Sequence, residues 1–145
     1  MRVPMKVDYG VRALVELAAH YGEGWVHTSE ISYKQGIPEA YLEQLLTTLQ
    51  KVGFVESRRG PQGGHALAMD PSAVNLSMVM TTLEGNTSPL DCLTDPSGCI
   101  FAESCAQQEV WKSVEDSIHS VLSNTTLTHL TQRQSYLSGQ GTYQI

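Results

Sequence analysis

The sequence predicts a mainly α-helical fold with a small β-hairpin wing, in which a winged helix-turn-helix unit precedes a long C-terminal dimerisation helix. Three observations support this fold class. Two helical segments separated by a turn at Gly36 form a helix-turn-helix pattern. A turn rich in glycine and proline follows directly, between two short strand candidates. A long stripe of apolar residues at helical spacing comes later, over 104–123.

The N-terminal third predicts three helices. Apolar side chains recur at spacings of three and four over 6–21, and a glycine ends this first helix. Thr28 is expected to cap a short second helix that stops near Gly36. Residues 38–51 repeat the helical period, with Pro38 at the first helical position. Many helical hairpins share this pattern, so it does not by itself indicate DNA binding.

The next segment predicts a wing. Residues 54–57 and 65–69 are strand candidates on either side of the turn at 58–64. A hairpin directly after the second helix of the pair has the position of a wing. Residues 71–85 predict one more helix, which ends at Gly85.

The predicted organisation has three parts. Residues 1–85 form the winged helix-turn-helix domain, 86–106 a cysteine-bearing loop, and 104–145 the dimerisation helix and tail. The segment 86–103 is expected to be a loop, because it contains two prolines and a glycine.

The long helix over 104–123 has little left in its own chain to cover its apolar stripe. An exposed stripe of this kind predicts a homodimer. A short helical segment is expected over 127–137, followed by a polar, mobile end. The residues expected at the dimer interface are Val110, Trp111, Val114, Ile118 and Val121.

Composition limits the class of protein. The 145 residues are 41% hydrophobic, which is enough for a core, and no apolar run approaches the length of a membrane helix. Charged residues interrupt the N-terminal apolar positions, so we expect no signal peptide and a cytoplasmic protein. The net charge of −6 argues against nucleic-acid binding through bulk charge, but it permits a local basic surface such as Arg58 and Arg59.

All three cysteines lie within fourteen residues, in the pattern Cys92-x6-Cys99-x5-Cys105. An odd, clustered set without an export signal is poor evidence for disulfides and favours metal or redox chemistry. Soft thiolates suit iron–sulfur clusters and zinc alike. Spacing alone therefore leaves an iron–sulfur cluster, a structural zinc site and unmetallated thiols open.

Three stretches of the chain resemble the Rrf2 family of bacterial winged-helix regulators, which includes the IscR and NsrR types. They are YLEQLL at 41–46, GFVES at 53–57 and RGPQGG at 59–64, and the cysteine cluster before a long helix completes the match. The resemblance implies a homodimer whose two DNA-binding units bind a roughly palindromic double-stranded operator. It also implies an iron–sulfur cluster, 2Fe-2S or 4Fe-4S, on the three cysteines. One departure is His65, where the family usually has an aromatic residue.

A second departure concerns the fourth cluster ligand. IscR-type members carry a histidine shortly after the third cysteine, whereas 106–108 here contain none. The NsrR-like branch instead uses an acid near the start of the partner subunit's first helix, and Asp8 lies where that branch has it. The alternative for Asp8 is a solvated acid that the helix dipole stabilises. His119 and His27 are the other candidates.

The second helix of the pair is expected to lie in the major groove. The resemblance places Glu43 where the family reads bases, and a carboxylate accepts from cytosine N4, while Gln44 could pair with adenine. Wing arginines are candidates for phosphate or minor-groove contact. Ordinary surface polarity is the alternative for the helix residues, and Tyr41 could instead pack against the first helix. The expected DNA-binding residues are Thr28, Tyr41, Glu43, Gln44, Thr47, Arg58, Arg59 and Gly60.

The sequence therefore favours a DNA-binding transcription regulator, expected to be a repressor, with a cluster that senses redox state, nitric oxide or iron–sulfur supply. The alternatives are a regulator of the same fold controlled by zinc or a protein partner, and an interaction module that does not bind DNA. An enzyme is not expected, because no phosphate loop or paired carboxylate site is present.

Overall fold

The computed structural model describes residues 2–139. The predicted mobile end falls largely on 140–145, outside the described residues. The elements in chain order are α1 (Met5–Ala19), α2 (Thr28–Gln35), α3 (Glu39–Lys51), β1 (Val55–Arg58), β2 (Gly64–Leu67), η1 (Pro71–Ala73), α4 (Leu76–Glu84), α5 (Asp91–Thr94), η2 (Pro96–Gly98), α6 (Ala106–Ser123) and α7 (Leu127–Leu137).

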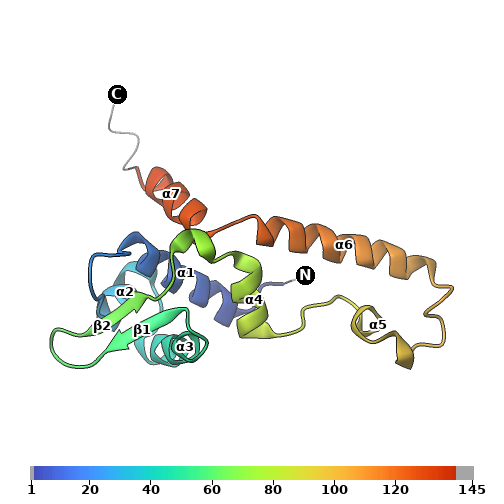
Figure 1. Ribbon diagram of the computed structural model, residues 1–145, viewed down its shortest axis with the longest axis horizontal. Coiled ribbons are helices and arrows are strands. Elements are labelled where there is room, and N and C mark those ends of the chain that lie inside the picture. Colours follow the sequence, from blue (N-terminus) through green and yellow to red (C-terminus); the bar gives the residue numbers. More distant parts are fainter. Residues whose placement is uncertain (1, 140–145) are drawn as a thin grey trace.

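Two parts of the molecule are distinct in Figure 1. The body contains α1 to α4, the two-stranded wing and α7. The arm, formed by residues 86–123, carries α5 and η2 outward and returns through α6. This arrangement confirms the predicted fold class, a winged helix-turn-helix unit with a long C-terminal helix.

Apolar side chains at helical spacing close the core of the body. Leu42, Leu46 and Leu49 occupy one face of α3, and all are at most 1% exposed. Burial of such side chains from water is the main force that holds the helices together. The other fully buried large side chains are Leu14, Leu17, Ile31, Ile37, Val74, Val79 and Leu127.

The wing is a regular antiparallel hairpin. Val55 pairs with Leu67 at its base and Arg58 pairs with Gly64 near its tip. A further bridge joins Val26 to His65, with two backbone hydrogen bonds of 2.8 Å. This bridge attaches the wing to the segment that leads into α2.

The structure corrects the predicted start of α2. Thr28 does not cap the helix; the N-cap is His27, and no side chain caps it. The carbonyl of His27 accepts the backbone N–H groups of Glu30 and Ile31 instead. The hydroxyl of Thr28 is hydrogen-bonded to His65, at 2.9 Å, and this long-range contact replaces the local cap.

Three further features differ from prediction. The helix expected over 71–85 begins only at Leu76, because Asn75 is its extended N-cap and the preceding residues form η1. The loop expected over 86–103 contains α5 and η2. Pro38 is the N-cap of α3 rather than its first helical residue. The helix expected over 127–137 has those bounds in the structure.

No residue of α6 is buried, although α6 is the longest helix among the described residues. Its contacts to the body are made mainly to α4. Among the described helices, none combines the length and the apolar character that a membrane span requires.

Candidate nucleic-acid interface and cysteine loop

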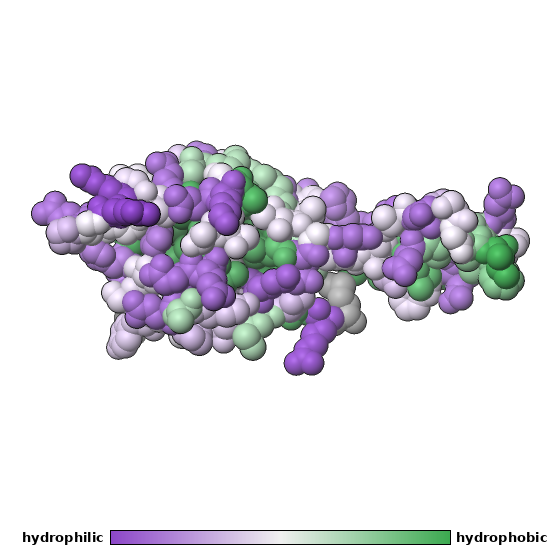
Figure 2. All heavy atoms as spheres, turned by 90° about the horizontal axis from the view of Figure 1, so that it is seen from below, coloured by the Kyte–Doolittle hydropathy of each residue, from purple (hydrophilic) through white to green (hydrophobic). Residues whose placement is uncertain are grey.

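One face of α3 is polar and open to solvent. Glu43, Gln44 and Thr47 are exposed, while the leucines between them are buried. The Thr47 hydroxyl donates to the Glu43 carbonyl at 2.9 Å, so that its oxygen can still accept a bond from outside. Seen from the side of α3 and the wing, the body presents mostly hydrophilic side chains (Figure 2). The structure therefore places the expected base-reading residues on one accessible surface.

Tyr41 packs against the first helix, which was one of its two expected roles. Its half-buried ring meets Tyr9 of α1 edge-on, with ring centroids 5.5 Å apart and an interplanar angle of 73°. The Arg12 guanidinium also lies near this pair, 5.5 Å from the Tyr9 centroid. The ring contact orients α3 on α1.

The wing tip carries uncompensated positive charge. Arg58, Arg59 and Gly60 are exposed, and within residues 2–139 neither arginine forms an ion pair. Gly60 has a φ of 105°, which favours glycine and turns the chain at this point. The arginines are thus free to meet an anionic partner.

The part of the wing next to its tip contains His65, which pairs with Ser57. Its ring is hydrogen-bonded to Thr28 Oγ1 at 2.9 Å and to Ser57 Oγ at 2.7 Å. Burial lowers the pKa of His65, and the negative charge of Glu43 opposes that shift. Nothing in the sequence singled out this network beyond the unusual residue type at position 65.

The three cysteines lie in the outer half of the arm. Cys92 is in α5, Cys99 ends η2, and Cys105 is the N-cap of α6, where the helix dipole favours a thiolate. All three are free and half-buried. Asp95 accepts hydrogen bonds from the backbone N–H and hydroxyl of Ser97, which fixes the turn between the first two cysteines and lowers the Asp95 pKa.

The donor set fits an iron–sulfur cluster, since soft thiolates are what its iron atoms require. In the described chain, the three thiols do not form a group whose ligand atoms all lie within 4.8 Å of one another. Such a tight group of ligand atoms would suit a single metal ion. The ligands of a cluster are divided among two or four iron atoms, so they need not all converge on one point.

Asp8 lies in the first turn of α1 and is exposed, with a carboxylate oxygen 4.0 Å from Arg12. Within one described chain it does not join a ligand group with the cysteines. A role at the cysteine loop would therefore need the partner subunit, as the resemblance implies. Of the other candidates, His119 is hydrogen-bonded to Ser77 and Ser123 between α4 and α6, and His27 is the N-cap of α2.

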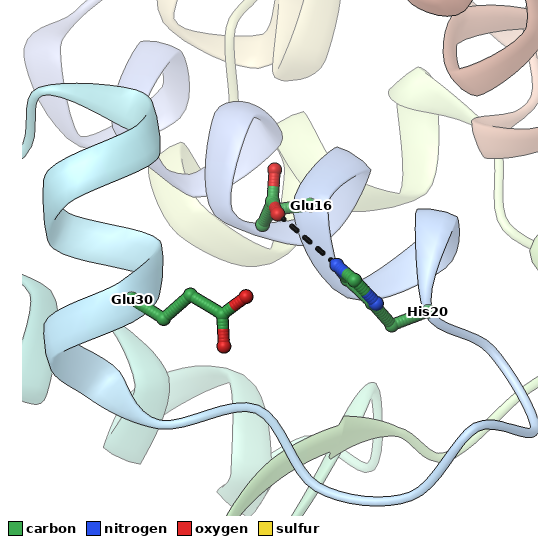
Figure 3. Close-up of side chains that lie close together, drawn as sticks. All are labelled: Glu16, His20 and Glu30. Carbon is green, nitrogen blue, oxygen red and sulfur yellow. Dashed lines mark hydrogen bonds and ion pairs between the residues drawn. The ribbon is translucent and has the colours of Figure 1, made fainter.

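Sequence reasoning missed one cluster, which joins α1 to α2. Glu16, His20 and Glu30 have ligand atoms within 4.8 Å of one another (Figure 3). The Lys34 ammonium lies 3.3 Å from Glu16 and 2.9 Å from Glu30, so a cation already neutralises the group. These bonds lower the pKa of Glu30 and raise that of Lys34. Gln35 also donates to the buried Glu16, at 2.9 Å, and the cluster acts as an ion-pair network between the helices.

The predicted dimer stripe is uncovered in the single chain. Val110 and Val121 are 61% and 66% exposed, and Trp111 and Val114 are also exposed, while Ile118 is half-buried. At the free end of the arm, hydrophobic side chains gather on the surface (Figure 2). An exposed apolar area of the described chain therefore runs along the arm.

A helix pair with an exposed polar recognition face, followed by a basic wing, defines a winged helix-turn-helix DNA-binding regulator. The family model of Rrf2, described as an iron-dependent transcriptional regulator, matches residues 3–133. The chain belongs to the Rrf2 family of transcription regulators.

Two differently named regulators are similar to the chain over most of its length. The HTH-type transcriptional regulator IscR of Yersinia enterocolitica is 36% identical over 137 residues, 94% of this chain and 83% of that protein. CymR of Bacillus subtilis, also an HTH-type transcriptional regulator, is 35% identical over 140 residues, 97% and 94% of the two chains.

Two solved structures with these names resemble the chain. The structure of CymR, the global cysteine regulator of B. subtilis, has a TM-score of 0.79 and 34% identity, over 92% of this chain and 98% of that one. IscR of T. potens has a TM-score of 0.75 and 35% identity, over 92% and 88%.

Proposed function

We propose that this regulator reads its operator with the exposed face of α3 and with the wing. Glu43 and Gln44 would meet base edges in the major groove, with Thr28 and Thr47 beside them. Arg58 and Arg59 would contact phosphates or the minor groove, where Gly60 permits close approach of the backbone. The unpaired charge of the wing supports this assignment, because the chain as a whole is acidic.

The regulator would act as a homodimer on a roughly palindromic operator. Val110, Trp111, Val114, Ile118 and Val121 of α6 would form the interface. The support is the exposure of this stripe along a helix that is otherwise polar. A two-fold axis through α6 would place two reading heads, each formed by α3 and the wing of one subunit, on successive half-sites.

Cys92, Cys99 and Cys105 would hold an iron–sulfur cluster that sets operator affinity. The observation that carries this proposal is the position of three free, half-buried thiols. They lie just before and at the N-terminal end of α6, the helix with the dimer stripe. When bound, the cluster supplies a centre that reacts with oxygen or nitric oxide and reports iron–sulfur supply. A change in the cysteine loop would reach the paired α6 helices through Cys105.

Asp8 of the partner subunit would provide the fourth ligand. An exposed carboxylate in the first turn of α1 is free to bind, since its nearest cation is at 4.0 Å. A carboxylate is a hard ligand among soft thiolates, so this corner would be the easiest to displace. Ligation across the dimer would link the state of the cluster to the relative position of the two reading heads.

The test is the spectrum of anaerobically isolated protein. Visible absorbance, an electron paramagnetic resonance signal after reduction, and matching iron and sulfide contents are expected. Asp8→Ala should keep the dimer and alter the spectrum or shorten the lifetime of the cluster in air. Arg12→Ala is the matched control, because it removes the same ion pair and leaves the carboxylate in place. An unchanged cluster in Asp8→Ala would exclude this residue as a ligand.

A second candidate function is a regulator of the same fold that works without a cluster. The similarity to CymR, described as a global cysteine regulator, favours it. Zinc or a protein partner would then control DNA binding. Colourless protein that carries zinc or no metal, yet shifts a specific DNA fragment, would support this alternative.

A further inference from the structure

His65 is the meeting point of three segments that approach the DNA-reading surface. Its ring bonds Ser57 of β1 on one side and Thr28 of α2 on the other, at 2.7 and 2.9 Å. Its backbone forms two hydrogen bonds of 2.8 Å with Val26. One residue therefore joins both wing strands to the start of the helix-turn-helix unit.

The glycine before His65 makes this close approach possible. A Cβ atom on Gly64 would lie 2.5 Å from the carbonyl oxygen of Val26, and the φ of 146° is one that side chains rarely adopt. The wing at Gly64 is consequently held in close contact with the segment that leads into α2. The tip, in contrast, is open to solvent and carries the two arginines.

An imidazole is well suited to this position. It has two nitrogens on different edges of the ring, and neutral histidine donates from one and accepts at the other. The hydroxyls of Ser57 and Thr28 both donate and accept, so each can take the role that the ring leaves open.

The bridge lies beside the recognition helix. Glu43 of α3 is close enough for its charge to act on the His65 ring. Arg58 is also close to the bridge along the wing, because Ser57 pairs with His65 and Arg58 is the next residue of β1. The bridge is therefore next to the strand residue that carries the first of the two wing arginines.

We propose that His65 is a positioning residue that holds the wing at a fixed angle to the recognition helix and so aligns Arg58 and Arg59 with the DNA backbone. The inference rests on the proposed role of α3 and the wing in DNA binding, and it is independent of any cluster. When a contact is already ordered in the free protein, binding does not have to overcome the conformational entropy lost in ordering it.

The test compares variants on a DNA duplex selected from a random pool by the wild-type protein. His65→Phe keeps a ring of similar size and removes both side-chain bonds. It should weaken binding about 3- to 10-fold, as expected when a contact must be ordered on binding. The dependence of affinity on salt should become shallower, by about one ion for each phosphate that the wing arginines no longer neutralise.

A double-mutant cycle separates positioning from general damage. If His65 acts through the wing, then His65→Phe should add little to the loss caused by Arg58→Ala and Arg59→Ala together. Losses that multiply, or a His65→Phe variant with wild-type affinity and salt dependence, would overturn the inference. Ser57→Ala removes only one bond and leaves His65 in place, and it should give a smaller loss of the same kind even if His65→Phe folds poorly. Failure of the wild-type protein to select any duplex would instead overturn the proposed DNA binding itself.

Discussion

His65 also gives the fold a dependence on pH. Burial lowers its pKa below the ordinary value of 6.5, and Glu43 opposes the shift without cancelling it. Between the lowered value and 6.5 the unfolded chain binds more protons than the folded one, so stability falls as the pH drops through this range. We expect the midpoint of urea unfolding to fall between about pH 7 and pH 5.5 more steeply in wild type than in His65→Phe. The other four histidines are common to both proteins. Parallel pH profiles would contradict this prediction.

Single residues show where sequence reasoning stops. Thr28 has the side chain of a helix cap, yet its hydroxyl bonds a histidine 37 positions away. Tyr41 had two expected roles, and the edge contact with Tyr9 identifies packing against α1. In each case the sequence predicted the chemical group, while the partner was supplied by a segment that is distant in the chain.

At the scale of elements, the wing depends on its paired glycines. A Cβ atom on Gly63 would clash with the carbonyl group of Arg58, and backbone atoms cannot rotate away as a side chain can. Gly63→Ala should therefore cost about 1–3 kcal/mol of unfolding free energy, the usual cost of overpacking. Gly98→Ala is the control, because its Cβ would meet nothing within 4 Å. The measurement is the urea midpoint at constant slope. Equal midpoints for the two variants would show that the turn relaxes freely.

The sequence predicted those helices that are long enough to show several repeats of the helical period. The helix over 127–137 was predicted at its observed bounds, and the apolar spacing of α3 indicated its buried face. The four residues of α5 are too few to display a helical period, and η1 and η2 depend on aspartates that accept hydrogen bonds from residues two positions ahead. The residue types of the cysteine loop therefore indicated its chemistry, whereas its short helices were not predicted.

At the scale of the whole molecule, the sequence indicated the parts of the candidate site but not their assembly. Three thiols, an exposed acid at the start of α1 and an uncovered stripe on α6 are all present in one chain. The described chain does not gather the acid and the thiols into one group. Ligation by Asp8 and pairing of α6 both require a second subunit, which a single sequence does not describe.

The apolar stripe of α6 leads to a prediction about the assembly. Val110→Asp together with Val121→Asp places two charges on the most exposed part of the stripe. No residue of α6 is buried in the single chain, so the body should stay folded while the proposed dimer dissociates. Light scattering should give the mass of a monomer, and the circular dichroism spectrum should keep its helical signal.

The same variant tests how dimerisation serves DNA binding. Loss of the second reading head removes the gain from linked half-sites, so affinity for a two-site duplex should fall about 100-fold or more. Affinity for a duplex with one half-site should change little, because α3 and the wing are untouched. Ser113→Asp is the matched control, since it adds a charge at an exposed polar position of the same helix. If the double variant remains a dimer while Ser113→Asp does not, then the interface lies on the polar face of α6 rather than on the apolar stripe.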